Sequence, residues 1–194
     1  MLTGSRVTLD IVTNEHGDFL YGLFADPRGA GVVKYHGATP GPDEVGAGLW
    51  DHVLAQFIVS SRETHQPFGL VVLSSPNFVD RYCFLSIAAG PLTPRRGLVI
   101  EGAILCLSYA FAHWDFRKIY LDVTAPGLSQ FARTLGRYAE LEGRLRHHQF
   151  IDGAYVDLYK YAIYADVWRR EAVRLHRSVG GSAPVAPRPD PSRA

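Results

Sequence analysis

The sequence has no excess of charge of either sign, no long apolar run and only two cysteines. Its 20 lysine and arginine residues nearly balance 19 aspartate and glutamate residues, which gives a formal net charge of +1. No global field therefore draws the chain to nucleic acid or to an anionic membrane, and any basic site must be local. No segment has the apolar length of a membrane span or the character of a signal peptide. We expect a cytoplasmic protein with no nucleic-acid or membrane partner.

Metal and disulfide chemistry is also unexpected. Cys83 and Cys106 lie inside apolar segments, without the close spacing of a metal knuckle or a redox pair. We interpret both as buried thiols in a reducing compartment. The adjacent pair His147 and His148 would point to opposite faces of a strand, and no third ligand accompanies it, so we predict no metal site.

The chain of 194 residues is long enough for one domain with a sizeable core. We assign residues 1–176 to that domain. Residues 177–194 include the proline-rich stretch "GGSAPVAPRPDPSRA", which cannot offset its ordering entropy by apolar burial. We therefore expect a disordered C-terminal tail.

Apolar periodicity predicts a mixture of strands and helices. Alternating residues indicate strands over 6–12, 68–75, 81–90 and 117–127, and a hairpin around Asp152-Gly153 within 137–164. Helical spacing indicates helices over 15–26, 42–63, 98–112, 128–135 and 166–177. Pro27 would end the first of these helices, and Gly136 would stand in the C-cap position of the fourth. The helix over 42–63 depends on a stripe of Leu49, Val53, Phe57 and Ile58. This order predicts a mixed sheet flanked by helices, with a strand–helix–strand crossover at its centre.

The stretch "GPLTPRRGLVIEGAIL" at residues 90–105 joins a strand to a buried helix. The first N–H groups of such a helix have no intrahelical partner, and together with the helix dipole they attract phosphate. Gly97 allows close backbone approach, and Arg95 and Arg96 add charged donors. These residues favour a pyrophosphate site, although the same composition is common in an ordinary surface turn.

The element order around this turn resembles the GCN5-related N-acetyltransferase (GNAT) superfamily, in its ribosomal-protein N-terminal acetyltransferase-like branch. Pro91, Gly97 and Glu101 match the signature turn of that family. A later family pattern appears here as "TLGRY" and "EGRLR", followed by Asp152-Gly153 and by three single residues further along the chain. These residues are Asp157, Tyr161 and Trp168. The resemblance covers residues 6–168.

The resemblance implies an α/β (α+β) fold in which a mixed, mostly antiparallel sheet is flanked by helices and has a splayed pair of strands, the family's fourth and fifth. It implies acetyl-CoA or another acyl-CoA as co-substrate, and no metal. The backbone at the start of the helix would hold the pyrophosphate, and the end of the preceding strand would pair with pantetheine. The residues expected to bind the cofactor in this way are Arg95, Arg96, Gly97, Leu98, Val99 and Ile100 at the turn and Ile87, Ala88 and Ala89 on the strand.

The chain departs from the family at the phosphate turn. Pro94 stands where relatives carry glutamine or arginine, and Val99 where they carry glycine or alanine. Proline lacks an N–H and valine crowds the backbone, so we expect a looser or displaced phosphate cradle. The turn is thus a degenerate form of the signature.

The catalytic positions also differ. Phe84 occupies the place of a frequent glutamate, Ala125 that of an asparagine, and Phe131 that of a tyrosine. Ser129 lies close enough in sequence to replace one of the last two in contacting the cofactor. Candidates for proton transfer or water positioning are Tyr82 and Ser86, which share a strand face with Phe84, and His147, because histidine is the residue type best suited to act as a base near neutral pH.

These features predict an acyl-CoA-dependent N-acyltransferase, with acetyl as the transferred group and a primary amine of a small molecule or a peptide N-terminus as the acceptor. The amine would attack the thioester directly. The alternatives are a non-catalytic GNAT-fold binding module and an acyltransferase that accepts its donor from a carrier protein. A homodimer is compatible with each of them.

Overall fold

The protein is described here by a computed structural model, which covers residues 1–26, 34–35, 37–90 and 96–178. Its β-sheet has eight strands in the order β1-β2-β3-β4-β5-β6-β8-β7. The neighbouring strands are antiparallel except for β5 and β6, which are parallel. The strands are β1 (Leu2–Thr3), β2 (Val7–Ile11), β3 (Val53–Ser61), β4 (Pro67–Asn77), β5 (Tyr82–Ala89), β6 (Lys118–Thr124), β7 (Glu140–Ile151) and β8 (Ala154–Tyr164).

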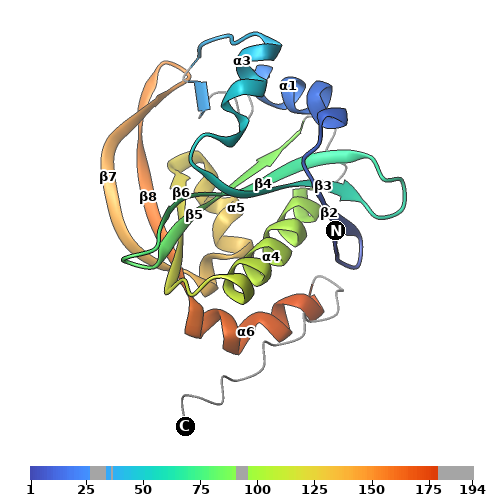
Figure 1. The fold of residues 1–194 in the computed structure, drawn as a ribbon. Helices are drawn as coiled ribbons and strands as arrows, with labels where there is room; N and C mark the ends of the chain where they lie inside the picture. Colours follow the sequence, from blue (N-terminus) through green and yellow to red (C-terminus); the bar gives the residue numbers. More distant parts are fainter. Residues whose placement is uncertain (27–33, 36, 91–95, 179–194) are drawn as a thin grey trace.

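Helices cover parts of both faces of this sheet (Figure 1). The α-helices are α1 (Gly17–Ala25), α3 (Pro42–Ala47), α4 (Arg96–His113), α5 (Leu128–Thr134) and α6 (Ala165–Ser178). Short 3-10 helices are η1 (Asn14–His16), η2 (Gly48–Trp50), η3 (Ala125–Gly127) and η4 (Gly136–Tyr138). In Figure 1, α1 and α3 gather at one end of the molecule and α6 lies at the other.

Two apolar clusters hold the helices on opposite faces of the sheet. The larger cluster packs α4 against one face, where Val59 of β3 and Val71 of β4 are fully buried. The smaller one packs α1 and α3 against the other face, at Ile58 and Leu70. Neighbouring residues of a strand point to opposite faces, so β3 and β4 are buried on both sides. The part of the second face beyond α1 and α3 is the surface on which the candidate site lies.

The predicted helix over 42–63 is wrong in its second half. A short α3 and η2 end at Trp50, and β3 follows from Val53 to Ser61. All five residues from Gln56 to Ser60 are buried. A strand covered on both faces has no apolar–polar alternation, so its pattern is easily taken for part of a helix.

The other predicted elements are present within the described residues. The hairpin turn at Asp152-Gly153 has φ of 49° and 79°, as expected of a two-residue turn that suits the sheet twist. The predicted C-cap of α5 at Gly136 is wrong, because the helix ends at Leu135 and Gly136 begins η4. The predicted tail stays a prediction, because residues 179–194 lie outside the described part.

Both cysteines are free and buried, as expected. Burial raises the pKa of the Cys83 thiol to about 12 and that of Cys106 higher still. In the described residues, no helix combines the length and apolar character needed to cross a membrane.

Candidate active site

The parallel pairing of β5 and β6 is short and ends abruptly. It consists of three residue pairs, of which Phe84↔Tyr120 is the last. Beyond that pair, β5 continues to Ala89 and β6 to Thr124 with no further ladder between them. Strand β5 stays paired with β4 as far as Ala89, so its backbone remains extended along the opening. This is the splayed pair of strands that the sequence predicts.

Helix α4 begins at the open end of the splay and runs along the sheet (Figure 1). The residues before it, 91–95, lie outside the described part, and with them lie Pro94 and the predicted ligand Arg95. Arg96 is the first residue of α4. Gly97 follows, and a Cβ added there would meet no atom of the described residues within 4 Å. The described part of the protein leaves open space beside this backbone, as the close approach of a ligand requires.

Val99 does not obstruct this open space. Its side chain is 2 % exposed and is turned into the core against Gly69 of β4. A Cβ added at Gly69 would lie 3.1 Å from a methyl carbon of Val99 and 3.0 Å from the carbonyl oxygen of Ala88. The Val99 side chain thus occupies room that a glycine leaves in the strand beneath. The looser phosphate cradle stays a prediction, because residues 91–95 lie outside the described part.

The remaining residues predicted to bind the cofactor follow the two sides of the opening. Leu98 and Ile100 are partly buried against the larger core. Ile87 and Ala88 are partly buried and Ala89 is exposed, all three on the part of β5 beyond its last pair with β6. Their backbone edge facing β6 can accept an extended ligand as an added strand.

The predicted catalytic residues on β5 lie at two different levels of the splay. Tyr82 pairs with Lys118 at the closed end, and its ring packs edge-on against Tyr120, with centroids 5.4 Å apart. Ser86 is exposed and lies beyond the last pair, on the same strand face as Tyr82. The structure therefore brings Ser86, but not Tyr82, to the open part of the splay.

A carboxylate that the sequence analysis missed lies across the opening from Ser86. Phe84 and Tyr120 are paired and stacked, with ring centroids 5.3 Å apart, so they share one face. Asp122 follows Tyr120 by two residues and is the first β6 residue on that face beyond the last pair. Ser86 and Asp122 thus flank the opening on the face opposite α4.

Lys160 of β8 ties this carboxylate to the aromatic residues. Its Nζ donates to Oδ1 of Asp122 at 2.6 Å and lies 4.6 Å from the centroid of the Phe84 ring. The ion pair is partly exposed, with 29 % of the Lys160 side chain and 36 % of the Asp122 side chain accessible. An ammonium above a ring face is attracted by the ring quadrupole, so Phe84 helps to fix Lys160. The ion pair of Lys160 and Asp122 therefore lies at the fork, the point where β5 and β6 separate.

A second cluster occupies the closed end of the same face. Glu142 accepts hydrogen bonds from Lys118 Nζ at 2.8 Å, from the Tyr120 hydroxyl at 2.9 Å and from the Tyr164 hydroxyl at 2.5 Å. Burial alone would raise the pKa of Glu142, but these hydrogen bonds outweigh it and lower the pKa. With donors on both of its oxygens, Glu142 is suited to holding β6, β7 and β8 together.

His147 lies in a bulge of β7 with a left-handed backbone, φ 51°. Its N–H donates to Oδ1 of Asp157 at 2.8 Å, and Arg144 Nε donates to the other oxygen at 2.6 Å. These two hydrogen bonds lower the pKa of Asp157, the N–H of His147 having the larger effect. Strand β6 ends at Thr124, opposite Leu158, so the hairpin tip with His147 extends past the end of β6 on the open side. The His147 side chain is exposed there.

The cofactor side of the splay has no phenol at position 131. Phe131 of α5 is buried, and its ring lies 4.5 Å from that of Tyr161, measured between centroids. Ser129 is exposed in the first turn of α5, and its carbonyl accepts a hydrogen bond from Arg133. The phenol beside Phe131 therefore comes from β8.

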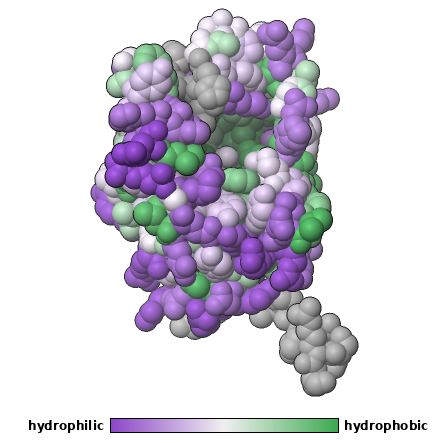
Figure 2. Space-filling view, turned by 90° about the vertical axis from the view of Figure 1, so that its left-hand side faces the viewer, coloured by the Kyte–Doolittle hydropathy of each residue, from purple (hydrophilic) through white to green (hydrophobic). Residues whose placement is uncertain are grey.

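The side of the molecule that carries β7 and β8 is hollowed (Figure 2). The floor of the hollow is apolar, and much of its rim is hydrophilic. Among the described residues, no group of three or more histidine, cysteine, aspartate or glutamate side chains is arranged to hold a metal ion.

No family model and no curated protein sequence matches the chain. Among solved structures, the spermidine N-acetyltransferase from Vibrio cholerae in complex with CoA and spermine is similar, with a TM-score of 0.73 and 21 % identity over 86 % of this chain and 99 % of that one. SpeG from Vibrio cholerae in complex with manganese ions has a TM-score of 0.71 and 21 % identity over 86 % and 97 %. A chimera of that enzyme with hSSAT has a TM-score of 0.71 and 22 % identity over 86 % and 99 %. Likeness at this level of identity shows a shared fold, and the chain therefore has the mostly antiparallel, helix-flanked GNAT fold that its sequence predicts.

Proposed function

We propose that this protein is an acyl-CoA-dependent N-acyltransferase that transfers an acetyl group to a primary amine of a small molecule. The observation that carries the proposal is the splay of β5 and β6 after Phe84↔Tyr120, with α4 starting at its open end. A similar fold in an enzyme that binds CoA and spermine supports it.

The residues around the splay suit acetyl-CoA. The open space beside Gly97 and the first N–H groups of α4 would hold the pyrophosphate. The unpaired edge of β5 from Ile87 to Ala89 would hold the pantetheine amides. When bound, acetyl-CoA supplies the activated acetyl group, and backbone N–H groups of β5 are suited to polarising its carbonyl.

Asp122 is the residue to which we assign proton removal from the acceptor amine, directly or through one water. Its carboxylate stands on the face opposite α4, so the acceptor and the cofactor would approach the splay from opposite sides. Lys160 orients the carboxylate through its hydrogen bond at 2.6 Å. Ser86 on the facing strand can position the amine or the water.

Three further residues belong to the proposal with smaller roles. His147 can assist proton removal from the hairpin tip, and Tyr82 acts through the ring packing that holds Tyr120. On the cofactor side, Ser129 can contact pantetheine, and the hydroxyl of Tyr161 can protonate the departing thiolate in place of the one that Phe131 lacks.

The proposal includes the ribosomal-protein N-terminal acetyltransferase-like branch with its degenerate phosphate turn, and with that branch a peptide N-terminus as the second acceptor class. A homodimer is compatible with it. The alternatives remain a non-catalytic binding module and a protein that takes its acyl group from a carrier protein.

The deciding experiment combines thermal unfolding with an assay of thiol release. CoA and acetyl-CoA should raise the melting temperature in a saturable way, because a ligand selective for the folded state stabilises it. Thiol release from acetyl-CoA should then depend on an added amine, tested with polyamines, amino acids and short peptides. Folded protein with no shift at millimolar CoA would leave the binding module as the better description. Equal turnover with a pantetheine-only thioester would favour the carrier-protein donor.

A further inference from the structure

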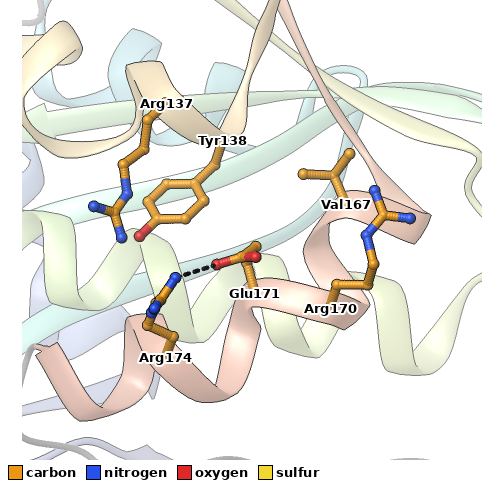
Figure 3. A pocket seen from close by; sticks show the side chains of 6 residues that line it. All are labelled: Arg137, Tyr138, Val167, Arg170, Glu171 and Arg174. Carbon is orange, nitrogen blue, oxygen red and sulfur yellow. Dashed lines mark ion pairs between the residues drawn. The ribbon is translucent and has the colours of Figure 1, made fainter.

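A second site lies between η4 and α6, where six residues line a pocket of about 290 Å³ (Figure 3). They are Arg137, Tyr138, Val167, Arg170, Glu171 and Arg174. The volume is close to the lower end of the range for small-ligand pockets, ~300 Å³. The lining contains three guanidinium groups and one carboxylate, so the pocket is suited to an anion.

The wall formed by η4 is fixed in place. Tyr138 is 6 % exposed, and the Arg137 guanidinium lies 4.6 Å from the centroid of its ring. A guanidinium stacked on an aromatic face keeps its in-plane N–H donors available at the edges. No ion pair joins Arg137 to a carboxylate among the described residues. The Arg137 guanidinium is therefore held in position while its N–H groups remain available to a ligand.

The wall formed by α6 supplies the remaining charges. Arg170 pairs with Asp166 at 3.1 Å, and Arg174 lies 3.7 Å from Glu171, beyond hydrogen-bonding distance. In Figure 3, Arg174 and Glu171 approach Tyr138 from α6, while Arg170 stands at the other end of the pocket. A ligand can therefore recruit Arg174 without breaking a hydrogen bond to Glu171.

We propose that this pocket binds inorganic hydrogen phosphate. A tetrahedral oxyanion can accept from several arginines at once, whereas a planar carboxylate is satisfied by one bidentate fork. Glu171 would distinguish between oxyanions. Its carboxylate repels an anion that carries no proton, but it accepts a hydrogen bond from the O–H that phosphate retains at neutral pH. Sulfate has the same shape and no such proton. The site should thus prefer phosphate to sulfate.

The pocket is separate from the proposed acyl-CoA site. Helix α6 follows Tyr164, which pairs with Lys118, the first residue of β6. Helix η4 precedes β7, whose first residue, Glu140, pairs with Ala162 of β8. Both lie at the closed end of the β5–β6 pair. The start of α4 is at the open end, and Figure 1 shows α6 at the far side of the molecule from α1 and α3.

Calorimetric titration of the full chain with phosphate and with sulfate, at one fixed ionic strength, tests the proposal. Phosphate should bind with a Kd on the order of a millimolar or tighter, and sulfate about tenfold more weakly. Arg137→Gln and Arg174→Gln should each raise the phosphate Kd about tenfold, the loss expected of one charge-assisted contact. Arg169→Gln is the matched control, since it removes the same charge from α6 outside the pocket lining and should change the Kd less than twofold.

Glu171→Gln should abolish the preference for phosphate over sulfate. Saturating CoA, or the Gly97→Trp variant, should leave phosphate binding unchanged. Loss of phosphate binding in either condition would instead place the anion at the start of α4 and overturn the proposal. It would also be overturned if folded protein binds no phosphate, or if Arg169→Gln weakens binding as much as Arg137→Gln. None of these results depends on whether the protein transfers acetyl groups.

Discussion

The Lys160 ammonium lies 4.6 Å from the centroid of the Phe84 ring, at the last residue pair before β5 and β6 separate. In the superfamily that the sequence resembles, a glutamate often stands at the position of Phe84. Here the charge at the fork comes instead from the neighbouring strands, as the Lys160–Asp122 pair. A carboxylate therefore lies near the fork, on β6 and not on β5.

Asp122→Asn should lower kcat/KM for acetyl transfer about 10²-fold, the lower range for loss of a general base. The Kd of CoA should stay the same, because the carboxylate lies on the acceptor face. Glu63→Gln, at an exposed turn between β3 and β4, is the matched control and should retain full activity. A wild-type rate in Asp122→Asn would remove this residue from the mechanism.

His147→Gly separates the side chain of this residue from its backbone role. The left-handed φ of 51° costs a non-glycine residue about 1 kcal/mol, so glycine should fit the bulge and keep the N–H bond to Asp157. Unfolding by urea should show equal or greater stability. We expect turnover to fall severalfold at neutral pH if the imidazole assists proton removal. Unchanged turnover in this well-folded variant would assign His147 a purely structural part.

Gly97→Trp should abolish CoA binding while the domain stays folded. The indole would fill the open space beside the second residue of α4, where an added Cβ would meet none of the described atoms within 4 Å. Calorimetry with CoA should show no heat, and circular dichroism should be unchanged. Gly17→Trp, at the equally open first residue of α1, is the control for introducing an indole at a helix start. CoA affinity that survives Gly97→Trp would refute the placement of the pyrophosphate.

Glu142→Gln should change how the free energy of unfolding depends on pH in the acidic range. The pKa of Glu142 is lower in the folded protein than its ordinary 4.5, so the unfolded chain binds the proton more readily as the pH falls. The stabilising contribution is therefore present above the ordinary pKa and is lost as the pH drops through the folded value. The variant should lose about 1 kcal/mol of unfolding free energy at pH 7, because solvent screens this partly exposed carboxylate, and less at acidic pH. Urea unfolding across a pH series measures the difference, which a parallel pair of curves would contradict.

Much of the fold follows from local pattern. Alternating residues locate β5, β6 and the β7–β8 hairpin, and the turn chemistry of Asp152-Gly153 fixes where that hairpin reverses. Strand β3 was not predicted as a strand, because its five consecutive buried residues show no alternation of apolar and polar side chains. Burial on both faces is decided by α1 and α4, which the local sequence of β3 does not encode.

The candidate site was harder to predict for a similar reason. Gly97 and Ser86 follow from the family signature and from counting along β5. Asp122 depends on the register of β6 with β5 and on where their pairing stops, and both are set by contacts between distant segments. One sequence signal was present, because Asp122 follows Tyr120 by two residues and so shares its face.

The contact between Val99 and Gly69 makes the size of each side chain depend on the other, although the two residues are far apart in the chain. A protein engineer who restored the family's small residue at 99 would delete methyl groups from a filled interior and gain no room at the helix mouth, since the valine never faced it. The two positions should therefore be exchanged together or left alone.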